Sequence, residues 1–418
     1  MRKEWSIRKL GDICTFENGD RGKNYPSRSV FTTAGVPFIN AGHLSANGLA
    51  VTELDYIPRN RYDLLSNGKI RKGDVLFCLR GSLGKFAPVN EIVEGAIASS
   101  LVIIRTTNAI SNDFLLYYLE SSLCKAMIAK YSNGAAQPNL SARNLAQFEI
   151  PLPPLAEQQH IVAILDDAFA GLEIATANAE KNLKNARELF ESYLNSVFES
   201  AADWSQSPIG KLATKIGSGA TPTGGEKSYK KQGVPLIRSL NVHDRRFKID
   251  DLAFLDDTQA KKLDGVTVQS GDVLLNITGA SVARCCLAPD QFLPARVNQH
   301  VSIIRPIQSA ILPPFLEFGL TAKVNKDRLL GVGESGGATR QAITKAQIQA
   351  FVFSYPSLAT QQTIIEKLDS LGAGTGKLES GYADKIKALA GLKQSILQKA
   401  FSGELSSSPS RALNEAAE

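Results

Sequence analysis

The sequence is poor in the residues that form covalent or metal frameworks. Its 418 residues include five cysteines, four histidines, two methionines and two tryptophans. The cysteines are odd in number and form no Cys-x-x-Cys pair, which disfavours both a disulfide framework and a zinc site. The histidines also lack the spacing of metal ligands. We therefore expect reduced thiols, no metal held by this chain, and a cytoplasmic location.

Long hydrophobic runs are missing as well. No apolar run approaches the roughly 18 residues that a membrane-spanning helix needs. The first six residues lack the apolar core of a signal peptide. The hydrophobic fraction of 43% and the charged fraction of 21% are typical of a globular chain. At this length we expect two hydrophobic cores and no association with a membrane.

The motifs of common DNA-modifying enzymes are absent too. The sequence contains no Gly-x-x-x-x-Gly-Lys-Ser/Thr phosphate loop, no Asp/Glu-x-Lys triplet typical of metal-dependent nucleases, and no Asn/Asp-Pro-Pro-Tyr/Phe segment typical of amino-methyltransferases. Gly217-Ser218-Gly219 lacks the rest of a dinucleotide fingerprint. Asp74 and Asp272 precede strand-like runs at matching turns, and we interpret both as turn caps. The sequence therefore predicts a chain without catalytic or cofactor-binding residues.

The strongest positive feature is an internal repeat. Four segments return in the same order about 200 residues later: residues 35–39 as 233–237, residues 73–76 as 271–274, residues 103–105 as 303–305, and residues 155–159 as 358–362. A unit of that length is too long for a solenoid repeat and has the size of one domain plus an arm. The chain is therefore predicted to be an internal duplication.

Each half begins with a segment whose pattern predicts a domain of strands and helices. Short apolar runs bounded by Gly, Asn and Asp predict strands at residues 36–39, 75–79 and 101–104, and again at 234–237, 273–277 and 301–304. Helical patterns follow at residues 113–131 and 314–330. The fold class predicted for both segments is α/β (α+β).

Each half ends with a long helical pattern. After Pro153-Pro154, apolar residues recur every three or four positions from Ile161 to Val197, and a second such series runs from Ile364 to Ile396. The connectivity predicts an antiparallel two-helix coiled coil, a rigid spacer with a globular domain at each end. The alternative is that each helix packs separately on its own domain. Four glycines in the second series predict a frayed, kinked or broken stretch near residues 370–377.

The positive charge is concentrated in the globular segments. Residues 1–157 hold 18 basic and 14 acidic residues, and residues 201–360 hold 19 and 13, whereas residues 158–200 hold 3 and 7. A basic domain suits a polyanionic partner such as DNA, although it is also compatible with a mildly basic surface that binds nothing.

Together these motifs resemble type I restriction–modification specificity subunits. Residues 150–162, which open the first long helix, are similar to the central conserved region of that family, and residues 355–362 form a degenerate second copy. Residues 393–405 resemble the end of the family's C-terminal helix, and the loops at residues 134–140 and 336–341 also fit. The resemblance covers residues 5–405, and its specificity comes from the order, duplication and spacing of the motifs.

The resemblance implies a domain organisation and a set of partners. Residues 1–157 and 201–360 would be target-recognition domains, residues 158–200 and 361–403 spacer helices, and residues 404–418 a flexible tail. Such a subunit is non-catalytic and reads a bipartite, asymmetric site on double-stranded DNA. It docks two methylation subunits and the restriction (motor) subunits. S-adenosylmethionine, ATP and Mg are expected on those partners, and no cofactor on this chain.

Candidate DNA-contacting residues lie on polar loops at matching places in the two halves. Affinity should come from Lys and Arg on phosphates, and specificity from polar side chains on base edges. The candidates are Asn40, His43, Arg80, Lys85, Ser99 and Ser100 in the first half, and Arg238, Asn241, His243, Arg245, Arg246, Arg284, Asn298, Gln299 and His300 in the second. Arg105 and Arg305, which follow buried-looking runs, are predicted to be structural.

Two other functions compete with DNA reading. A non-catalytic coiled-coil scaffold joining two protein-binding domains would show no salt-dependent DNA binding. An enzyme, either a nuclease or a methyltransferase–nuclease fusion, would need the missing motifs. The basic globular segments favour the specificity subunit over the scaffold.

Overall fold

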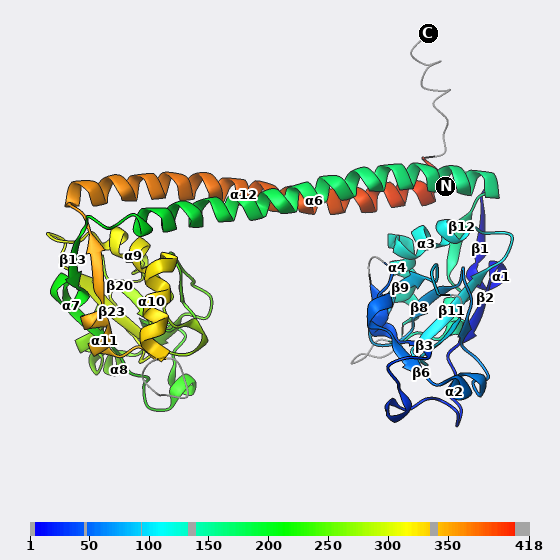
Figure 1. Ribbon diagram of the computed structural model, residues 1–418, viewed down its shortest axis with the longest axis horizontal. Coiled ribbons are helices and arrows are strands. Elements are labelled where there is room, and N and C mark those ends of the chain that lie inside the picture. Colours follow the sequence, from blue (N-terminus) through cyan, green and yellow to red (C-terminus); the bar gives the residue numbers. More distant parts are fainter. Residues whose placement is uncertain (1–4, 46–47, 93, 133–138, 335–341, 406–418) are drawn as a thin grey trace, which may run out of the picture. The chain divides into compact units, whose positions relative to one another are not determined.

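The computed structural model describes residues 5–405, except for residues 46–47, 93, 133–138 and 335–341. The chain divides into two compact units. Unit 1 comprises Met1–Ala179 and Asp384–Glu418, and unit 2 comprises Glu180–Ala383. Each unit contains one globular part and about half of each long helix (Figure 1). Most of the tail predicted for residues 404–418 and most of the two loops that fit the family lie outside the described residues.

The globular part of unit 1 is built on two four-stranded sheets. The first is antiparallel and has the order β2 (Cys14–Asn18), β11 (Leu101–Thr106), β8 (Val75–Cys78) and β9 (Phe86–Pro88). The second has the order β6 (Asp55–Ile57), β3 (Val36–Ile39), β10 (Gly95–Ile97) and β7 (Lys69–Ile70). Within it β3 and β10 run parallel. The chain crosses between the two sheets through the short turn that joins β10 to β11.

Two strand pairs and several α-helices also belong to the described residues of this part of the chain. The pairs are β1 (Ser6–Lys9) with β12 (Glu149–Leu152), and the hairpin β4 (Leu44–Ser45) with β5 (Gly48–Leu49). The helices are α1 (Leu10–Ile13), α2 (Arg59–Asp63), α3 (Asn112–Glu120), α4 (Ser122–Tyr131), α5 (Ala142–Leu145) and the long α6 (Leu155–Glu199). The helical pattern at residues 113–131 is thus two helices, because extended Ser121 ends α3 and its hydroxyl accepts from the Cys124 amide to start α4.

Unit 2 repeats this plan strand for strand. Its antiparallel sheet has the order β14 (Ala213–Ser218), β23 (Val301–Pro306), β20 (Val273–Asn276) and β21 (Cys285–Leu287). Its second sheet has the order β18 (Ala253–Leu255), β15 (Val234–Ile237), β22 (Ala295–Val297) and β19 (Thr267–Val268), with β15 and β22 parallel. The strand pairs are β13 (Ser205–Pro208) with β24 (Val352–Tyr355), and β16 (Val242–His243) with β17 (Arg246–Phe247).

The helices of unit 2 follow the same order. They are α7 (Ile209–Leu212), α8 (Asp257–Lys261), α9 (Pro313–Thr321), α10 (Lys323–Glu334), α11 (Lys345–Ala350) and the long α12 (Leu358–Ser402). Because the strand orders and the parallel pair coincide, the internal duplication and the mixed α/β class are confirmed. None of the described helices combines the length and the apolar composition needed to cross a membrane.

A buried glutamine fixes each long helix to its globular part. The Gln158 side chain donates to the carbonyls of Ala109 and Pro153, both at 2.9 Å, and accepts from the Ser111 amide at 2.9 Å. Gln361 does the same with Ala310 at 3.1 Å, Pro356 at 2.9 Å and the Leu312 amide at 2.9 Å. Both glutamines are fully buried. The repeated Gln-Gln motif therefore carries an interior clamp in the first turn of each long helix.

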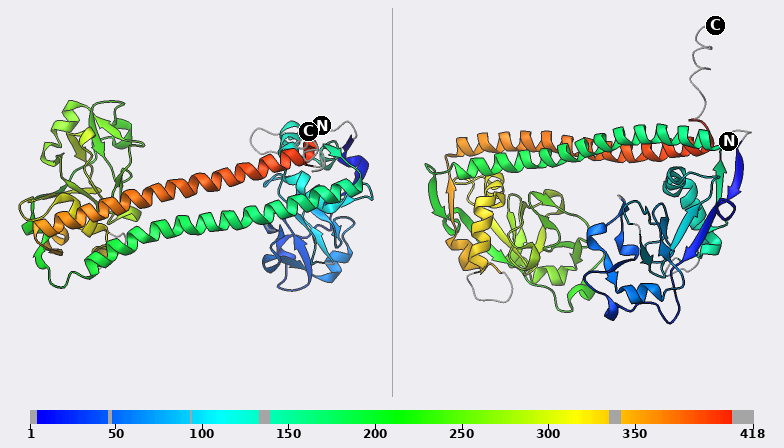
Figure 2. Two further views of the ribbon diagram at one scale, coloured as in Figure 1. Left: turned by 90° about the horizontal axis from the view of Figure 1, so that it is seen from above. Right: turned by 45° about the vertical axis from the view of Figure 1, so that its right-hand side comes forward.

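The two long helices pack against each other in antiparallel fashion inside each unit. In unit 1 the core contains Ile161 and Leu165 of α6 with Leu397 and Phe401 of α12. In unit 2 the end of α6 meets the start of α12, where Arg187 pairs with Glu379 at 2.9 Å. Figures 1 and 2 show the helices side by side within both units. The antiparallel helix pair is confirmed, and separate packing of the two helices is ruled out for the described residues.

The predicted break in the second helix is wrong. α12 is continuous from Leu358 to Ser402. Gly372 contacts the Phe190 ring of α6, where an added Cβ would lie 3.3 Å from the ring, and the adjacent Thr375 is buried. Packing against α6 therefore outweighs the roughly 1 kcal/mol that each interior glycine costs. The buried face of α12 also differs from the predicted apolar series, since Leu378 and Leu392 of that series are each 48% exposed.

Candidate nucleic-acid interface

In unit 1 the ends of several strands meet at one edge. Because β3 and β10 are parallel, their carboxyl ends lie together, and the Ala98 amide donates to the Ile39 carbonyl at 2.7 Å. The following turn reaches the other sheet, where the Leu79 amide donates to the Ser100 carbonyl at 2.8 Å. This edge brings together four predicted candidates and one arginine, Arg21, which donates to the Ser99 carbonyl at 3.2 Å. We name these residues strand-end cluster 1: Arg21, Asn40, Arg80, Ser99 and Ser100.

The side chains of this cluster differ in how freely they face solvent. Arg80 is exposed and donates to the Asn139 side chain at 3.1 Å. Asn40 is half-buried, accepts from the Gly42 amide at 2.7 Å and donates to Asp55 at 2.9 Å. Ser99 and Ser100 are half-buried. An exposed arginine beside small hydroxyl groups is a combination that reads base edges and binds phosphates.

Unit 2 builds the same edge with other side chains. The Asn298 amide donates to the Ile237 carbonyl at 3.1 Å, and the Ile277 amide donates to the His300 carbonyl at 3.0 Å. These bonds match those of Ala98 and Leu79 in unit 1. The residues at the equivalent positions, which we name strand-end cluster 2, are Thr221, Arg238, Thr278, Gln299 and His300.

Hydrogen bonds connect the side chains of cluster 2. The Thr221 hydroxyl donates to Gln299, the Gln299 amide lies 3.1 Å from the His300 ring, and the Thr278 hydroxyl lies 2.6 Å from His300 Nδ1. Arg238 donates to Glu226 at 3.2 Å and to the Asp251 carbonyl at 2.5 Å, and it stacks on the Tyr229 ring. Glutamine and histidine therefore stand together at this edge in a fixed arrangement.

Glycine lets the first loop of each unit approach the turn between the sheets. A Cβ at Gly19 would lie 2.5 Å from the Ala98 carbonyl oxygen, and one at Gly219 would lie 1.8 Å from the Val297 carbonyl oxygen. Any other residue would push Arg21 or Thr221 away from its cluster. The loops that follow carry the exposed cations Lys23 and Arg28 in unit 1, and Lys227, Lys230 and Lys231 in unit 2. Arg21, Thr221, Thr278 and these loop cations were not among the predicted candidates, although the two glycines at the same repeat position are a sequence signal that points to them.

Three predicted candidates are buried, and their side chains form hydrogen bonds with the backbone of their own loops. Asn241 is fully buried, accepts from the Arg238 amide at 3.0 Å and donates to the carbonyls of Lys248 and Asp250. His43 is 7% exposed, and its ring nitrogen accepts from the Asn40 amide at 3.2 Å. Asn298 is 4% exposed and accepts from the His300 amide at 3.0 Å. In this conformation Asn241 cannot reach DNA, and His43 is its structural counterpart in unit 1.

The remaining candidates are not part of the strand-end clusters as defined above. Lys85 and Arg284 occupy equivalent turns, where their carbonyls accept from Cys78 and Asn276, both at 2.8 Å. His243, Arg245 and Arg246 belong to the hairpin of β16 and β17. Arg245 pairs with Glu191 of α6 and lies 4.8 Å from the Phe190 ring centre, so it anchors the hairpin to the helix. Arg246 is exposed. The proposed contacts of these residues with DNA stay predictions, apart from the structural role that the geometry gives to Arg245.

The repeated arginines are structural, as predicted. Arg105 makes a two-bonded pair with Asp74 at 2.8 and 3.0 Å, and Arg305 makes the same pair with Asp272 at 2.7 and 2.8 Å. Asp74 and Asp272 also accept from the amides of Arg71 and Gln269, both at 2.8 Å, which confirms them as turn caps. Arg105 reaches a second carboxylate, Glu17. Burial alone would raise the pKa of the Glu17 carboxyl, but hydrogen bonds from Arg105 and the Gly68 amide hold that pKa below its usual range.

The cysteines of the chain are free and buried. Burial raises the pKa of the thiols of Cys14, Cys124 and Cys286 to about 12, so these thiols stay protonated at neutral pH. Among the residues that the structure describes, no group of three or more His, Cys, Asp or Glu side chains is arranged to hold a metal ion.

Comparison with known proteins agrees with this architecture. A solved chain of a type I R-M system, studied for complex assembly and conformational transition, matches with a TM-score of 0.77 at 21% identity, covering 96% of this chain and 98% of that chain. The HsdS subunit from Thermoanaerobacter tengcongensis matches with a TM-score of 0.57 at 20% identity, covering 96% and 97%. At these identities the matches establish the fold.

Sequence comparison assigns the family. The EcoKI specificity subunit of Escherichia coli strain K12 is 23% identical over 436 residues, which are 96% of this chain and 89% of that relative. The family model described as the type I restriction modification DNA specificity domain matches residues 2–185 and again residues 201–388. Because these two matches cover most of both halves, the resemblance seen in the sequence is confirmed and the chain belongs to the type I restriction modification DNA specificity family.

Proposed function

We propose that this chain is the specificity subunit of a type I restriction–modification complex and reads a bipartite, asymmetric site on double-stranded DNA. Strand-end cluster 1 would read one half-site and strand-end cluster 2 the other. One observation carries the proposal. The two units have the same backbone arrangement at the strand-end edge but different side chains at the equivalent positions. Arg80 stands where Thr278 stands in the other unit, and Ser100 stands where His300 stands. Different hydrogen-bonding groups on one scaffold favour different base sequences.

In this proposal the chemistry belongs to partner chains in the cytoplasm. Two methylation subunits would bring S-adenosylmethionine, and restriction subunits would bring ATP and Mg, whereas this chain would contribute recognition alone. The family assignment supports a complex of this kind. The alternative is a scaffold that joins two protein-binding domains, and it predicts no loss of DNA affinity with rising salt. A DNA reader that neutralises Z phosphates loses affinity with a log–log salt slope of about −0.9Z.

The test is a methylation map of cells that carry variants of this chain with its methylation partners. Wild type should methylate an asymmetric motif with two separated parts. Gln299→Ala with His300→Ala should relax or abolish recognition in one part, and Arg80→Ala in the other, each by about 10- to 100-fold per lost base contact. Arg8→Ala, an exposed arginine on β1 in a separate two-stranded sheet, is the matched control. If both parts of the motif weakened together in either variant, the assignment of one half-site to each unit would be wrong.

A second test asks whether the long helices act as a ruler, that is, whether their length sets the spacing between the two half-sites. α6 and α12 are each 45 residues long and continuous. Removing one turn from each helix at equivalent positions, residues 177–180 and 380–383, should change the number of bases between the two parts of the motif. An unchanged spacing in a variant that still methylates DNA would contradict the ruler.

A further inference from the structure

Basic side chains gather on the hairpin of β16 and β17 in unit 2. His243 and Arg246 stand opposite each other on its two strands, and Lys248 follows the second strand. Burial lowers the pKa of the His243 ring, and the neighbouring charges of Lys248, Arg284 and Arg246 lower it further, so the four side chains lie close together. We name these residues the hairpin patch: His243, Arg246, Lys248 and Arg284.

The charge of the hairpin patch is not neutralised by ion pairs. In the part of the chain that the structure describes, no carboxylate forms an ion pair with Arg246, Lys248 or Arg284. The acidic residue of the same hairpin, Asp244, pairs with Lys326 of α10 instead. Cations that crowd one another without a carboxylate favour the approach of an anion from outside the chain.

The hairpin is fixed to the rest of unit 2 by its turn. Asp244 pairs with Lys326 and accepts from the Cys285 amide at 3.2 Å. Arg245 pairs with Glu191 of α6. Because Arg245 has a φ of 56°, in the left-handed region that favours glycine, these contacts hold a turn that the residue by itself disfavours. The hairpin patch is therefore presented on a fixed backbone.

The hairpin also adjoins strand-end cluster 2. The Asn276 side chain donates to the carbonyl of Ser239 at 2.9 Å and to that of Val242, the first residue of β16, at 3.3 Å. Asn276 ends β20, and Thr278 of cluster 2 follows it closely in the chain. A duplex that is read at cluster 2 therefore lies within reach of the hairpin patch.

The hairpin of unit 1 carries no cation at the matching positions. The Lys248 amide donates to the Asn241 carbonyl at 2.8 Å, and the Ala50 amide donates to the His43 carbonyl at 2.9 Å, so the two hairpins have the same register. The residues that correspond to His243, Arg246 and Lys248 are Ser45, Gly48 and Ala50.

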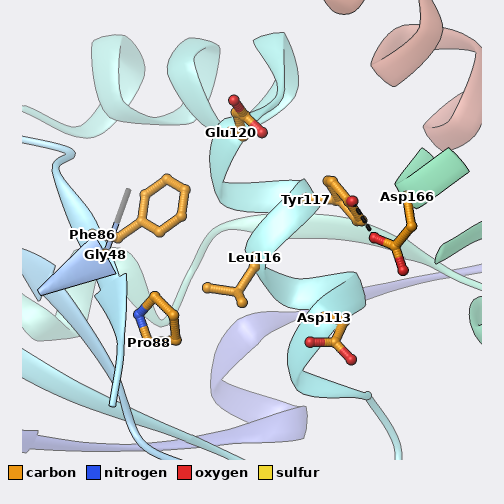
Figure 3. A pocket seen from close by; sticks show the side chains of 8 residues that line it. All are labelled: Gly48, Phe86, Pro88, Asp113, Leu116, Tyr117, Glu120 and Asp166. Carbon is orange, nitrogen blue, oxygen red and sulfur yellow. Dashed lines mark hydrogen bonds between the residues drawn. The ribbon is translucent and has the colours of Figure 1, made fainter. Parts of the chain in front are cut away.

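The surroundings of the unit 1 hairpin are acidic. Gly48 lines a cavity of about 370 Å³ together with Asp113, Glu120 and Asp166. Figure 3 shows Gly48 across this cavity from helix α3, which carries Asp113 and Glu120. Carboxylates repel phosphate, so of the four positions of the patch only that of Arg284, occupied by Lys85 in unit 1, keeps a cation there.

We propose that the hairpin patch of unit 2 is a clamp for phosphate groups of the DNA backbone, and that the hairpin of unit 1 is not. The inference rests on the proposed function and adds to it a difference in affinity between the two units. Lys and Arg bind phosphates without reading the sequence. The clamp therefore strengthens binding to any duplex and leaves the recognised bases unchanged.

The first experiment measures the affinity of the full chain, with its methylation subunits, for a duplex of random sequence at several salt concentrations. Arg246→Gln with Lys248→Gln should make the log–log salt slope shallower by about 2, because each phosphate contact contributes about 0.9. Lys211→Gln with Lys345→Gln is the matched control. It removes the same charge from exposed positions on α7, which precedes β14, and on α11, which contacts α7, and it should keep the slope.

The outcomes separate the clamp from base reading and from the proposed function. The charge-preserving variant Arg246→Lys with Lys248→Arg should keep the wild-type slope. The methylation map of the glutamine variant should show the wild-type motif, and a changed motif would assign these side chains to base reading and overturn the clamp. A steep slope that is equal in wild type, the glutamine variant and the control would overturn the clamp alone. Absence of salt-dependent binding in wild type would overturn the proposed function as well.

The difference between the units has its own test. Lys85→Gln in unit 1 should make the salt slope shallower by no more than about 1, since a single cation is removed there. If this variant lost more of the slope than Arg246→Gln with Lys248→Gln, the clamp would not be specific to unit 2.

The His243 ring reports on the clamp without any substitution. A phosphate held beside Arg246, Lys248 and Arg284 offsets the positive charges that lower the pKa of His243, so addition of a duplex should raise that pKa. NMR titration of the histidine rings in the full chain, with and without the duplex, measures the change. His160, exposed on α6, is the internal control, and its ring signals should not respond to the duplex. An unchanged pKa of His243 at saturating DNA would overturn the proposal.

Discussion

Unit 1 and unit 2 share two sets of interior hydrogen bonds and differ at their strand-end edges. Asp74 with Arg105 and Asp272 with Arg305 form the same two-bonded pair, and Gln158 and Gln361 form the same clamp. At the strand-end edges the two units carry different residue types at equivalent positions. The repeat therefore persists where a side chain satisfies buried polar groups, and it diverges where a side chain faces solvent and any polar residue can be accommodated.

That contrast separates scaffold from recognition within one chain. A buried hydrogen-bond partner cannot be exchanged without leaving another group unsatisfied. An exposed position at a strand end carries no such penalty, so it can take the residue that the ligand requires.

The largest expected effect comes from breaking one clamp at a time. Gln158→Ala should lower the stability of unit 1 by about 3 to 4 kcal/mol, because three buried hydrogen bonds lose one partner each. Gln361→Ala should do the same to unit 2. Hydrogen exchange of amides in the two sheets would measure each unit separately. Gln159→Ala, at the exposed neighbouring position, is the control and should change stability by less than about 0.5 kcal/mol. Equal loss of protection in both units after a single substitution would contradict separate clamps.

A second comparison uses the buried Glu317 and the half-buried Glu17, two carboxylates with opposite pKa shifts. Burial raises the pKa of the Glu317 carboxyl in unit 2 to about 7, against a hydrogen bond from the Leu287 amide. Folding then favours the protonated form, so the contribution of Glu317 to the stability of unit 2 should be fully present below pH 4.5 and should be lost as pH rises from there to about 7. Glu17 in unit 1 has a lowered pKa, so its contribution is present above pH 4.5 and is lost as pH falls below that value.

The variants Glu317→Gln and Glu17→Gln test these two signs. Glu317→Gln should remove the pH dependence of unit 2 between pH 4.5 and 7 and should stabilise that unit at pH 8 by about 2 to 3 kcal/mol. Glu17→Gln should leave unit 2 unchanged and remove part of the acid sensitivity of unit 1. The measurement is hydrogen exchange in each unit over that pH range. If the stability of wild-type unit 2 relative to Glu317→Gln rose between pH 4.5 and 7, the assigned sign would be wrong.

The smallest expected effect concerns the glycines that distinguish α12 from α6. Gly376→Ala and Gly381→Ala should each stabilise unit 2 by about 0.5 to 1 kcal/mol, because both positions are exposed and an added Cβ meets nothing within 4 Å. Gly372→Ala should gain less, since its Cβ would press on the Phe190 ring. Gly171→Ala in α6 is the matched control and should gain a similar amount in unit 1. Thermal unfolding would measure the gains, and a loss at Gly376 would point to a contact that a methyl group disturbs.

Much of the fold was predictable because the duplication repeats its interior. The repeated Gly-Asp turns, the apolar strands and the proline-flanked helix starts all have local sequence signals, and each was found where expected. The helix of residues 370–377 was mispredicted because glycine propensity is a local cost, whereas Phe190 on the partner helix supplies a stabilising contact that no local pattern contains.

The sequence indicated which candidates share the strand-end positions, and contact of these residues with DNA stays a prediction. Asn40, Arg80, Ser99, Arg238, Gln299 and His300 share strand-end positions, which the positions of the strands already indicated. Asn241 and His43 looked equally suitable, since a polar residue after a strand has the same sequence signature whether it points outward or clamps its own loop. Only the hydrogen bonds to neighbouring amides and carbonyls distinguish the two cases.

The sequence by itself determined the duplication, the mixed domains, the long helices and the family, because periodicity and ordered motifs are properties of the chain. The tertiary structure decided which polar residues are used for hydrogen bonds inside the molecule, that Arg21 and Thr221 join the strand-end clusters, and that Arg245 pairs with Glu191 of α6. The physical reason is that satisfaction of a polar group depends on partners tens to hundreds of residues away, and sequence spacing alone does not specify those distances.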